Sequence, residues 1–302
     1  LIDLVEKFVQ NELIPLETAV MAREAAGQPW ALTPEEEAPL MAKCKALGLW
    51  ALDAPEEVGG ANLSTKVRLA IEERQHGTVA PFIFPPDSPN LHMLMDVATP
   101  EQRQKYMLPY AQGEMKSCIA ISEPGAGGDP AQMKTHAVQD GDDWVINGRK
   151  IWVSHVPKAD FVILMAMTDP EKGARGGITA FIVDKGAPGF NIEREIAMLG
   201  GARTYELRIE DLRLGQSQVL GEVGQGFAPM QKRLTVKRLQ MGAMCVGMAS
   251  RALRMMCEHT QQRETFGHKL SDRQAIQWWI PDAATKIHAT RLMVMDAAET
   301  QD

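Results

Sequence analysis

One stretch of the sequence combines hydroxyl and glycine residues in a way that suits a flat polar ligand. Residues 117–129 read as an apolar strand that ends in a turn with three glycines, among them Gly127 and Gly128. A strand that ends in such a turn exposes backbone N–H groups beside the hydroxyl of Ser122. A ligand edge could rest there, whereas the plainer interpretation is an ordinary glycine-rich hairpin.

A second stretch, residues 145–154, places an aromatic ring beside a hydroxyl. Asn147-Gly148 stands between two strand patterns, and this dipeptide predicts a two-residue hairpin turn. Trp152 and Ser154 then share one face of the second strand, because alternate residues of a strand point to the same side. An indole beside a hydroxyl suits a planar heterocycle, although a lone strand Trp is more commonly part of the core.

Short strands are predicted to hold both stretches. Between residues 117 and 209, apolar or alternating runs are separated by Gly, Asp, Pro and Asn, without intervening helical patterns. Such runs indicate an antiparallel sheet or barrel of about a hundred residues and exclude a βαβ nucleotide fold. The predicted strands are 117–122, 135–138, 143–146, 150–153, 161–167, 178–183 and 205–209.

Helical patterns occupy the residues before the sheet. Apolar residues recur at helical spacing over residues 2–20, with a bend or end predicted near Pro15. Thr33 as N-cap, Pro34 at the first helical position and Gly48 after the last turn predict a second helix. Further helices are predicted at 64–76 and 100–110.

Helical periodicity returns after residue 226 and continues to the end of the chain. Two long patterns, 230–256 and 274–295, are too apolar to stand without packing partners. The first carries methionines that include Met230 and Met248, which we interpret as core filling rather than as a ligand surface. The last residues still read as helix, so we expect further chain beyond Asp302. The predicted fold is a multidomain α+β protein with a helical domain at 1–115, a β-domain at 116–222 and an incomplete helical domain at 223–302.

Composition narrows the possible functions. The 302 residues are 45% hydrophobic and 24% charged, which is typical of a packed globular protein. A net charge of −7 argues against nucleic acid, whose phosphates require concentrated Lys and Arg. No apolar run approaches the roughly 18 residues that span a bilayer, and the four cysteines lack zinc-site spacing. We therefore expect a cytoplasmic protein (mitochondrial matrix if eukaryotic) with no metal, no nucleic-acid partner and no membrane insertion.

Four motifs together resemble the acyl-CoA dehydrogenase family. Residues 122–129 (SEPGAGGD) are similar to the family's T/S-E-P-x-A-G-S/G-D turn, and residues 146–154 (INGRKIWVS) to its I-N-G-x-K-x-W-I/V-T/S strand. Residues 220–227 (LGEVGQGF) resemble its L-G-x-x-G-x-G-F junction, and residues 263–274 (RETFGHKLSDRQ) its R-x-x-F-G-x-x-L-x-x-x-Q segment. Because all four occur in the family's order, the chain is identified as a member.

The resemblance implies a helical bundle, a β-domain and a second helical bundle, with FAD as cofactor. The residues implied to face the flavin are Ile119, Ile121, Ser122, Gly127, Trp152, Val153 and Ser154. Those implied to reach the FAD of a neighbouring subunit are Arg263, Thr265, Phe266, Leu270 and Gln274. Cofactor contacts across subunits imply a homodimer or homotetramer, and Arg263 suits the pyrophosphate because a guanidinium pairs with phosphate through two parallel hydrogen bonds.

The resemblance also implies a reaction of fatty acid metabolism. A carboxylate base removes the α-proton of an acyl-CoA thioester while a β-hydride passes to the flavin, which leaves a trans-2-enoyl-CoA and sends electrons to an electron-transfer flavoprotein. Gly128 and Arg238 match positions close to the substrate. No catalytic base is assigned, because Lys237 occupies one of the family's two base positions and the other lies in a C-terminal segment that this chain lacks. Glu222 and Glu264 are interpreted as a loop residue and a helix-face residue.

Two other functions stay open at this point. A flavin oxidase or monooxygenase would use the same fold, since access of oxygen depends on pocket shape. A non-catalytic binding subunit is the second alternative, favoured if the chain is naturally short. Acyl-chain preference is not predicted.

Overall fold

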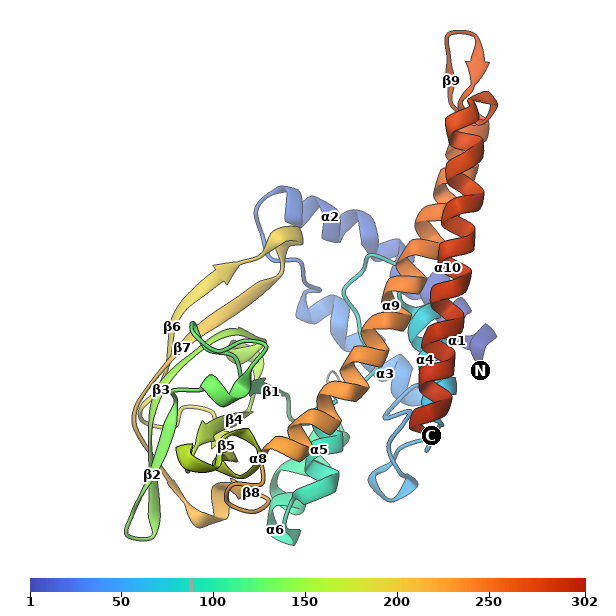
Figure 1. Ribbon diagram of the computed structural model, residues 1–302. Coiled ribbons are helices and arrows are strands. Elements are labelled where there is room, and N and C mark those ends of the chain that lie inside the picture. Colours follow the sequence, from blue (N-terminus) through green and yellow to red (C-terminus); the bar gives the residue numbers. More distant parts are fainter. Residues whose placement is uncertain (87–88) are drawn as a thin grey trace. The chain divides into compact units, whose positions relative to one another are not determined.

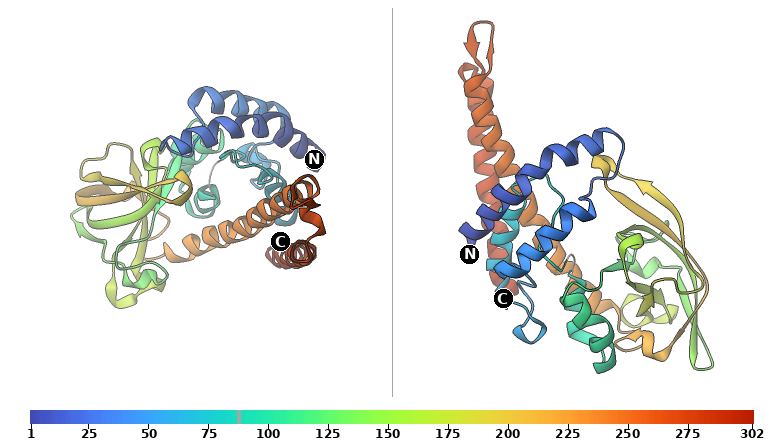
Figure 2. Two further views of the ribbon diagram at one scale, coloured as in Figure 1. Left: turned by 90° about the horizontal axis from the view of Figure 1, so that it is seen from above. Right: turned by 180° about the vertical axis from the view of Figure 1, so that it is seen from behind.

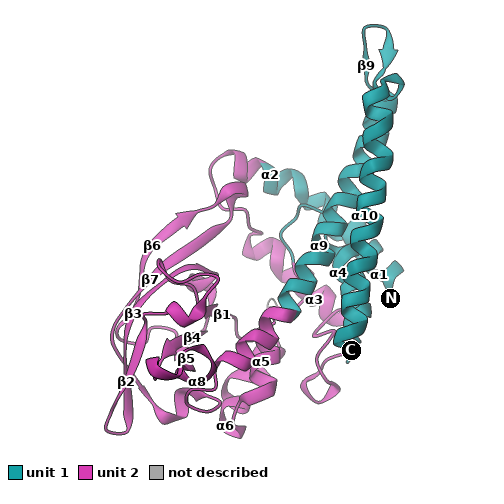
Figure 3. Cartoon of the chain, in the orientation of Figure 1, with its two compact units in different colours: residues 1–21, 62–82, 236–302 teal, residues 22–61, 83–235 magenta. Residues whose placement is uncertain are grey.

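The computed structural model describes residues 1–86 and 89–302 of the chain. The chain divides into two compact units (Figure 3): unit 1 contains residues 1–21, 62–82 and 236–302, and unit 2 contains residues 22–61 and 83–235. Two helices, α2 (Glu17–Ala25) and α9 (Phe227–Gln262), contribute residues to both units. The domain limits stated above stay a prediction.

Helix α3 (Pro34–Leu47) in unit 2 begins and ends where the sequence predicts. The Glu36 amide donates to the Thr33 hydroxyl at 3.3 Å, and the Thr33 amide donates to the Glu36 carboxylate at 2.9 Å, which completes a capping box. Gly48 ends the helix with a φ of 68°, a left-handed conformation that glycine adopts without a Cβ penalty. The other helices of this unit are α5 (Asn90–Val97), α6 (Pro100–Gln102), a π-helical turn (Arg103–Met107), α7 (Leu108–Ala111) and α8 (Ala174–Gly177). The helix predicted at 100–110 is therefore confirmed, whereas α5 was not predicted.

The sheet of unit 2 is mainly antiparallel, as expected, with parallel pairings of β1 and β2 to β4. Its strands are β1 (Ser117–Ala120), β2 (His136–Asp140), β3 (Asp143–Ser154), β4 (Phe161–Met167), β5 (Ile178–Asp184), β6 (Phe190–Ala197), β7 (Arg203–Gly215) and β8 (Val219–Leu220). Seven of them lie in the order β6-β7-β3-β2-β4-β5-β8, and β1 pairs with β4 outside this order. Strands β6 and β7 form the long ribbon visible in Figures 1 and 2. Strand β6 was not predicted.

Strand β4 lies at the centre of the unit 2 core because both of its faces are buried. Phe161, Ile163 and Met165 pack on the face that carries residues of α5 and α7. The ring of Tyr110 meets Phe161 at a centroid distance of 5.9 Å. Val162 and the alternate residues after it pack on the opposite face with β3 and β7. An uninterrupted apolar run is the expected sequence of a strand buried on both sides.

The hairpin predicted at Asn147-Gly148 is wrong. Strand β3 continues through both residues, and its register against β7 shifts between Ile146 and Gly148. The Asn147 side chain donates to the Asp211 carboxylate at 3.1 Å and accepts the Asp211 amide at 2.9 Å, so it stabilises a bulge rather than a turn. The dipeptide Asn-Gly is compatible with a bulge as well as with a hairpin turn. Here the pairing of β3 with β7 on both sides of the dipeptide selects the bulge.

Unit 1 is helical. The helical pattern over residues 2–20 is confirmed as α1 (Ile2–Phe8), a π-helical turn (Val9–Leu13), a 3-10 turn (Ile14–Leu16) around Pro15, and the first residues of α2. The helix predicted at 64–76 is confirmed as α4 (Thr65–Gln75), and it begins at a cap in which the Val67 amide donates to the Ser64 hydroxyl. Helices α9 and α10 (Gln274–Gln301) run side by side and are joined by the hairpin of β9 (Glu264–Thr265) and β10 (His268–Lys269) (Figures 1 and 2).

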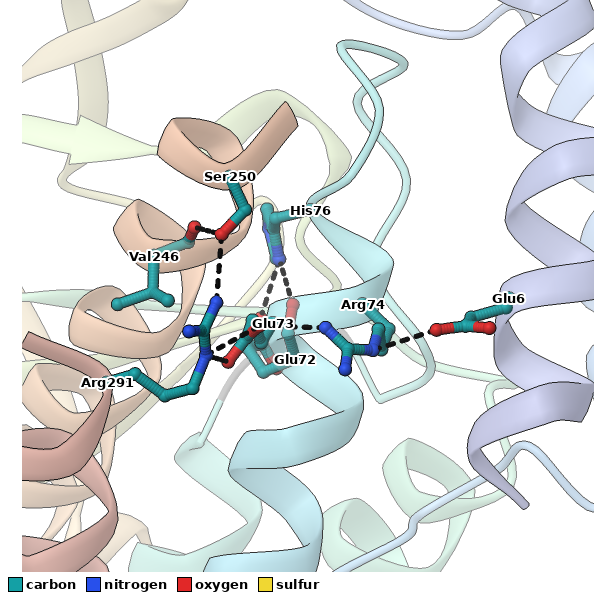
Figure 4. A network of polar contacts seen from close by, with 8 residues as sticks. All are labelled: Glu6, Glu72, Glu73, Arg74, His76, Val246, Ser250 and Arg291. Atoms are coloured by element: carbon teal, nitrogen blue, oxygen red, sulfur yellow. Dashed lines mark hydrogen bonds and ion pairs between the residues drawn. The ribbon is translucent and has the colours of Figure 1, made fainter. Parts of the chain in front are cut away.

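A buried carboxylate links the helices of unit 1 (Figure 4). The Glu73 carboxylate on α4 accepts hydrogen bonds from the Arg291 Nε atom of α10 at 3.0 and 3.1 Å. It also accepts one from Arg74 Nη1 at 2.8 Å. Arg291 also donates to the Ser250 hydroxyl of α9 at 3.0 Å, and Arg74 pairs with Glu6 of α1 at 2.9 Å. Four helices therefore meet around one carboxylate.

The interpretation of the methionine row as core filling holds only in part. Met230 is buried, but Met248 is 52% exposed because it lies on the outward side of α9. In the described part of the chain, no helix is long and apolar enough to cross a membrane, and no cluster of three metal-ligating side chains occurs.

Candidate functional site

The glycine turn after β1 presents open backbone. The Glu123 amide donates to the Ala126 carbonyl at 2.9 Å and the Ala126 amide to the Glu123 carbonyl at 3.1 Å, which closes a tight turn over Pro124 and Gly125. A Cβ built on Gly127 or Gly128 would meet no atom within 4 Å. The backbone of this turn is therefore accessible to a ligand, as the sequence suggests.

Strand β3 brings the aromatic residue to the same place. The Ile151 amide donates to the Ser122 carbonyl at 2.9 Å, so the strand that carries Trp152 is bonded directly to the turn. Trp152 is 52% exposed and has a φ of 62°, at a register shift between Lys150 and Val153. Its indole is therefore held outward beside the turn.

The remaining predicted residues of this site differ in what they can offer. Ile119, Ile121 and Ser122 are half-buried, and Ser154 is exposed on β3. Val153 is 3% exposed and belongs to the core between β3 and β4. A ligand contact from Val153 would therefore have to come from its backbone.

An ion pair that the sequence reasoning missed joins the turn to β3. The Lys150 ammonium donates to the Glu123 carboxylate at 2.8 Å and to the Ile121 carbonyl at 3.0 Å. The same carboxylate accepts the amides of Lys134 at 2.7 Å and Thr135 at 3.0 Å. The side chain of Lys150 is fully buried and that of Glu123 is 5% exposed. Lys150 and Ile146 are separated by an even number of residues on one strand, so both face the core side that buries Ile146. A lysine on this apolar face of the strand could have indicated a buried ion pair from the sequence.

Burial and pairing set the ionisation of both groups. Burial lowers the pKa of Lys150 to about 8, although the Glu123 charge opposes this shift. Burial alone would raise the pKa of Glu123, but the Lys150 charge and the bonds from Thr135 and Lys134 outweigh it and hold the pKa below its usual value. Both groups are therefore charged at neutral pH.

The second predicted set lies in unit 1, on and beside the β9–β10 hairpin. Phe266 at the tip is 96% exposed with a φ of 53°, and Arg263 is exposed and makes no ion pair within the described residues. The Arg273 guanidinium donates to the Thr265 carbonyl at 2.7 Å and braces the hairpin. Thr265 and Leu270 are half-buried and Gln274 is exposed. An aromatic ring and a guanidinium are thus presented outward from a braced hairpin.

Arg238, the second predicted substrate residue, is exposed on α9 in unit 1, and Lys237 beside it is half-buried. Gly128, the first, belongs to the open turn in unit 2. Glu264 is exposed on β9 rather than on a helix, so its interpretation as a helix-face residue is wrong. Glu222 lies in the loop after β8, as interpreted.

Comparison with family models assigns the chain. Models of the N-terminal, middle and C-terminal domains of acyl-CoA dehydrogenases match residues 1–114, 118–212 and 224–302. The chain belongs to the acyl-CoA dehydrogenase family. Members of this family are FAD-dependent oxidoreductases that act on CH–CH bonds.

Known acyl-CoA dehydrogenases agree with the assignment over nearly the full chain. The chain is 38% identical over 309 residues to (R)-benzylsuccinyl-CoA dehydrogenase of Thauera aromatica, which covers 99% of this chain and 76% of that protein. It is 34% identical to the CarC subunit of the caffeyl-CoA reductase-Etf complex of Acetobacterium woodii, over 89% of this chain and 71% of that protein. The structure of butyryl-CoA dehydrogenase from Megasphaera elsdenii matches with a TM-score of 0.85 and 28% identity, over 99% of this chain and 78% of that one.

The residues of unit 2 fit the flavin that acyl-CoA dehydrogenases carry. An isoalloxazine ring needs an apolar or aromatic surface for its plane and hydrogen-bonding groups for its polar edge. The outward indole of Trp152 offers the surface, and the open backbone at Gly127 and the hydroxyls of Ser122 and Ser154 offer the polar groups. The donor set and the accessible backbone therefore suit this cofactor.

Proposed function

We propose that this chain catalyses the α,β-dehydrogenation of an acyl-CoA thioester to a trans-2-enoyl-CoA and passes the electrons to an electron-transfer flavoprotein. The single observation that supports it is the bonding of the open glycine turn to the Trp152 strand, in a chain of the acyl-CoA dehydrogenase family. Bound FAD supplies the acceptor for the hydride. Electron transfer to a flavoprotein is supported by the Etf-complex subunit among the relatives.

The protein groups act by position. The backbone of Ser122 and Gly127 would hold the polar edge of the flavin, and Trp152 would limit where its ring can lie. Arg263 and Phe266 would reach the FAD of a second subunit in a homo-oligomer. Such fixed groups accelerate a reaction because no reorganisation is needed when charge develops.

An aryl-substituted acyl group is the proposed substrate class. The names of three relatives include an aryl group: (R)-benzylsuccinyl-CoA dehydrogenase, the caffeyl-CoA reductase complex subunit and 3-(aryl)acrylate reductase of Clostridium sporogenes. They are 38%, 34% and 33% identical to this chain. Straight-chain thioesters such as butyryl-CoA are the comparison class.

The test is anaerobic titration of the purified full-length protein with 3-phenylpropanoyl-CoA and with butyryl-CoA, followed by visible absorption. Bleaching of the flavin band, faster with the aryl thioester, is the expected result. The variant Trp152→Ala should lower FAD affinity about tenfold, the order of one lost aromatic contact of 1–1.5 kcal/mol. The control Val138→Ala, at an exposed position of β2, should not change it.

Each other outcome has a distinct meaning. A protein that takes up no FAD contradicts the proposal and leaves a binding subunit. Reduced flavin that reoxidises in air within seconds, before acceptor flavoprotein is added, would identify an oxidase instead.

A further inference from the structure

Lys150 is a fully buried cation, and a contribution to stability alone does not explain why it is there. Moving an ammonium group out of water carries a large free-energy penalty, and a buried ion pair commonly contributes no more than well-packed apolar residues would. Strand β3 already contributes the apolar residues Ile146 and Val153 to its core. The pair of Lys150 and Glu123 therefore calls for a reason other than stability.

The bonds of the pair show what it holds. Pairing of β1 with β4 ends at Ala120, so the next residues have no strand partner in the register. The Ile121 carbonyl accepts the Lys150 ammonium at 3.0 Å, and the Ser122 carbonyl accepts the Ile151 amide at 2.9 Å. The Glu123 carboxylate accepts two amides of residues 134–135. Three consecutive residues are thus fixed by groups of β3 and of residues 134–135, which lie outside the turn.

The glycines that follow these residues leave the backbone open. A Cβ atom built on glycine 125, 127 or 128 would meet no atom within 4 Å, and Ser122 is half-buried. A ligand that bonds to this backbone needs it in one conformation, and any free energy spent on ordering it is lost from binding. Hydrogen bonds that hold this backbone in one conformation therefore increase its affinity for a ligand that binds to it.

We propose that Lys150 and Glu123 are positioning residues for FAD, which act by fixing the backbone of residues 121–123. The inference rests on the proposed place of FAD against this turn. The pair does not touch the cofactor: the ammonium holds the Ile121 carbonyl, and the carboxylate anchors Glu123 to residues 134–135. Loss of either charge leaves the other group buried without its partner, so the turn moves toward water and the flavin loses its polar edge.

The test compares variants in the full-length protein. Lys150→Met keeps the length of the side chain but removes its charge and its donors, and Glu123→Gln keeps the shape of the carboxylate. The control is Glu206→Gln on β7, whose carboxylate is 4% exposed and pairs with Arg149 and Arg194 without contacting the turn. The measurements are the FAD dissociation constant of the apoprotein and the shape of the long-wavelength flavin absorption band.

We expect Lys150→Met to weaken FAD binding by at least about tenfold, the effect of losing one hydrogen bond to a charged group, and to alter the flavin band. Glu123→Gln should act in the same direction. Glu206→Gln should lose thermal stability while it keeps the affinity and the band of the unmodified protein.

Two results would overturn the inference: unmodified affinity and band shape in Lys150→Met, or changes no larger than those of Glu206→Gln. If Lys150→Met does not fold, Glu123→Gln decides by the same comparison. Failure of the proposed function is distinguishable, because the unmodified protein would then bind no FAD at this turn and the Trp152→Ala variant would have no effect.

Discussion

Gly148 on β3 tests how the two motifs are packed together. A Cβ at this position would lie 2.3 Å from the Thr135 hydroxyl oxygen and 2.5 Å from the Thr135 Cα atom. Ordinary carbon contacts need about 3.5 Å, so Gly148→Ala must displace the backbone of Thr135 by about 1 Å. Thr135 is fully buried and donates its amide to the Glu123 carboxylate at 3.0 Å.

The magnitude follows from these distances. A displacement of about 1 Å lengthens the Thr135–Glu123 hydrogen bond to about 4 Å, beyond any bonding distance. Overpacking contributes about 1–3 kcal/mol and the lost bond to a charged group about 1.5–3 kcal/mol. Alanine also lowers the conformational entropy of the unfolded chain, which offsets about 0.4–1 kcal/mol of this destabilisation. We expect Gly148→Ala to lower the free energy of unfolding by about 2–5 kcal/mol, and FAD affinity to fall with it.

The assay is urea denaturation followed by circular dichroism, together with FAD titration. The matched control is Gly127→Ala, because a Cβ there meets nothing within 4 Å. Gly127→Ala should change stability by less than about 0.5 kcal/mol yet weaken FAD binding, since the new methyl group would occupy open space beside the backbone that we propose binds the flavin. Unchanged stability in Gly148→Ala would refute the packing described for the two motifs. Unchanged FAD affinity in Gly127→Ala would contradict the proposal that FAD binds at this turn.

Two predictions concern unit 1. The Arg251 guanidinium, together with hydrogen bonds, lowers the pKa of Glu17 to about 2 against the opposing effect of burial. Because the native pKa is depressed, this stabilisation is complete above about pH 4.5 and is lost as the pH falls through about 2. With allowance for partial screening we expect about 2 kcal/mol. Acid titration of the unfolding free energy should lose this component in Glu17→Gln, and an unchanged acid profile would contradict it. In α9, a Cβ on Gly247 would lie 2.1 Å from the Glu73 carbonyl oxygen, whereas one on Gly242 meets only the Val294 side chain at 2.9 Å. Gly247→Ala should therefore destabilise by about 2 kcal/mol in urea unfolding, while Gly242→Ala should be near neutral, and equal effects would show that the helices separate freely.

Sequence reasoning succeeded where one short segment decides the structure. Thr33, Pro34 and Gly48 predict both ends of α3 because capping depends on residues within a single turn. The apolar run of β4 is likewise sufficient, since only a strand with two buried faces needs such a sequence. Strand β6 was missed for the opposite reason. Its residues are almost all exposed, so no alternation of apolar and polar residues marks it.

Only the family resemblance predicted that residues of the two motifs belong to one site, and the residue patterns alone did not connect them. Each motif indicated an accessible turn or an aromatic strand, and local chemistry gave no reason for the two to meet. That reason is non-local: Lys150 and Glu123 are 27 positions apart, and Gly148 leaves room for Thr135, which in turn bonds to Glu123. A Glu in one motif and a Lys in the other were read separately because their types suit a solvated surface as well as a buried pair. The ion pair that links the motifs also explains why neither Glu123 nor Lys150 can be replaced alone, since loss of one leaves the other buried and ionised without its partner.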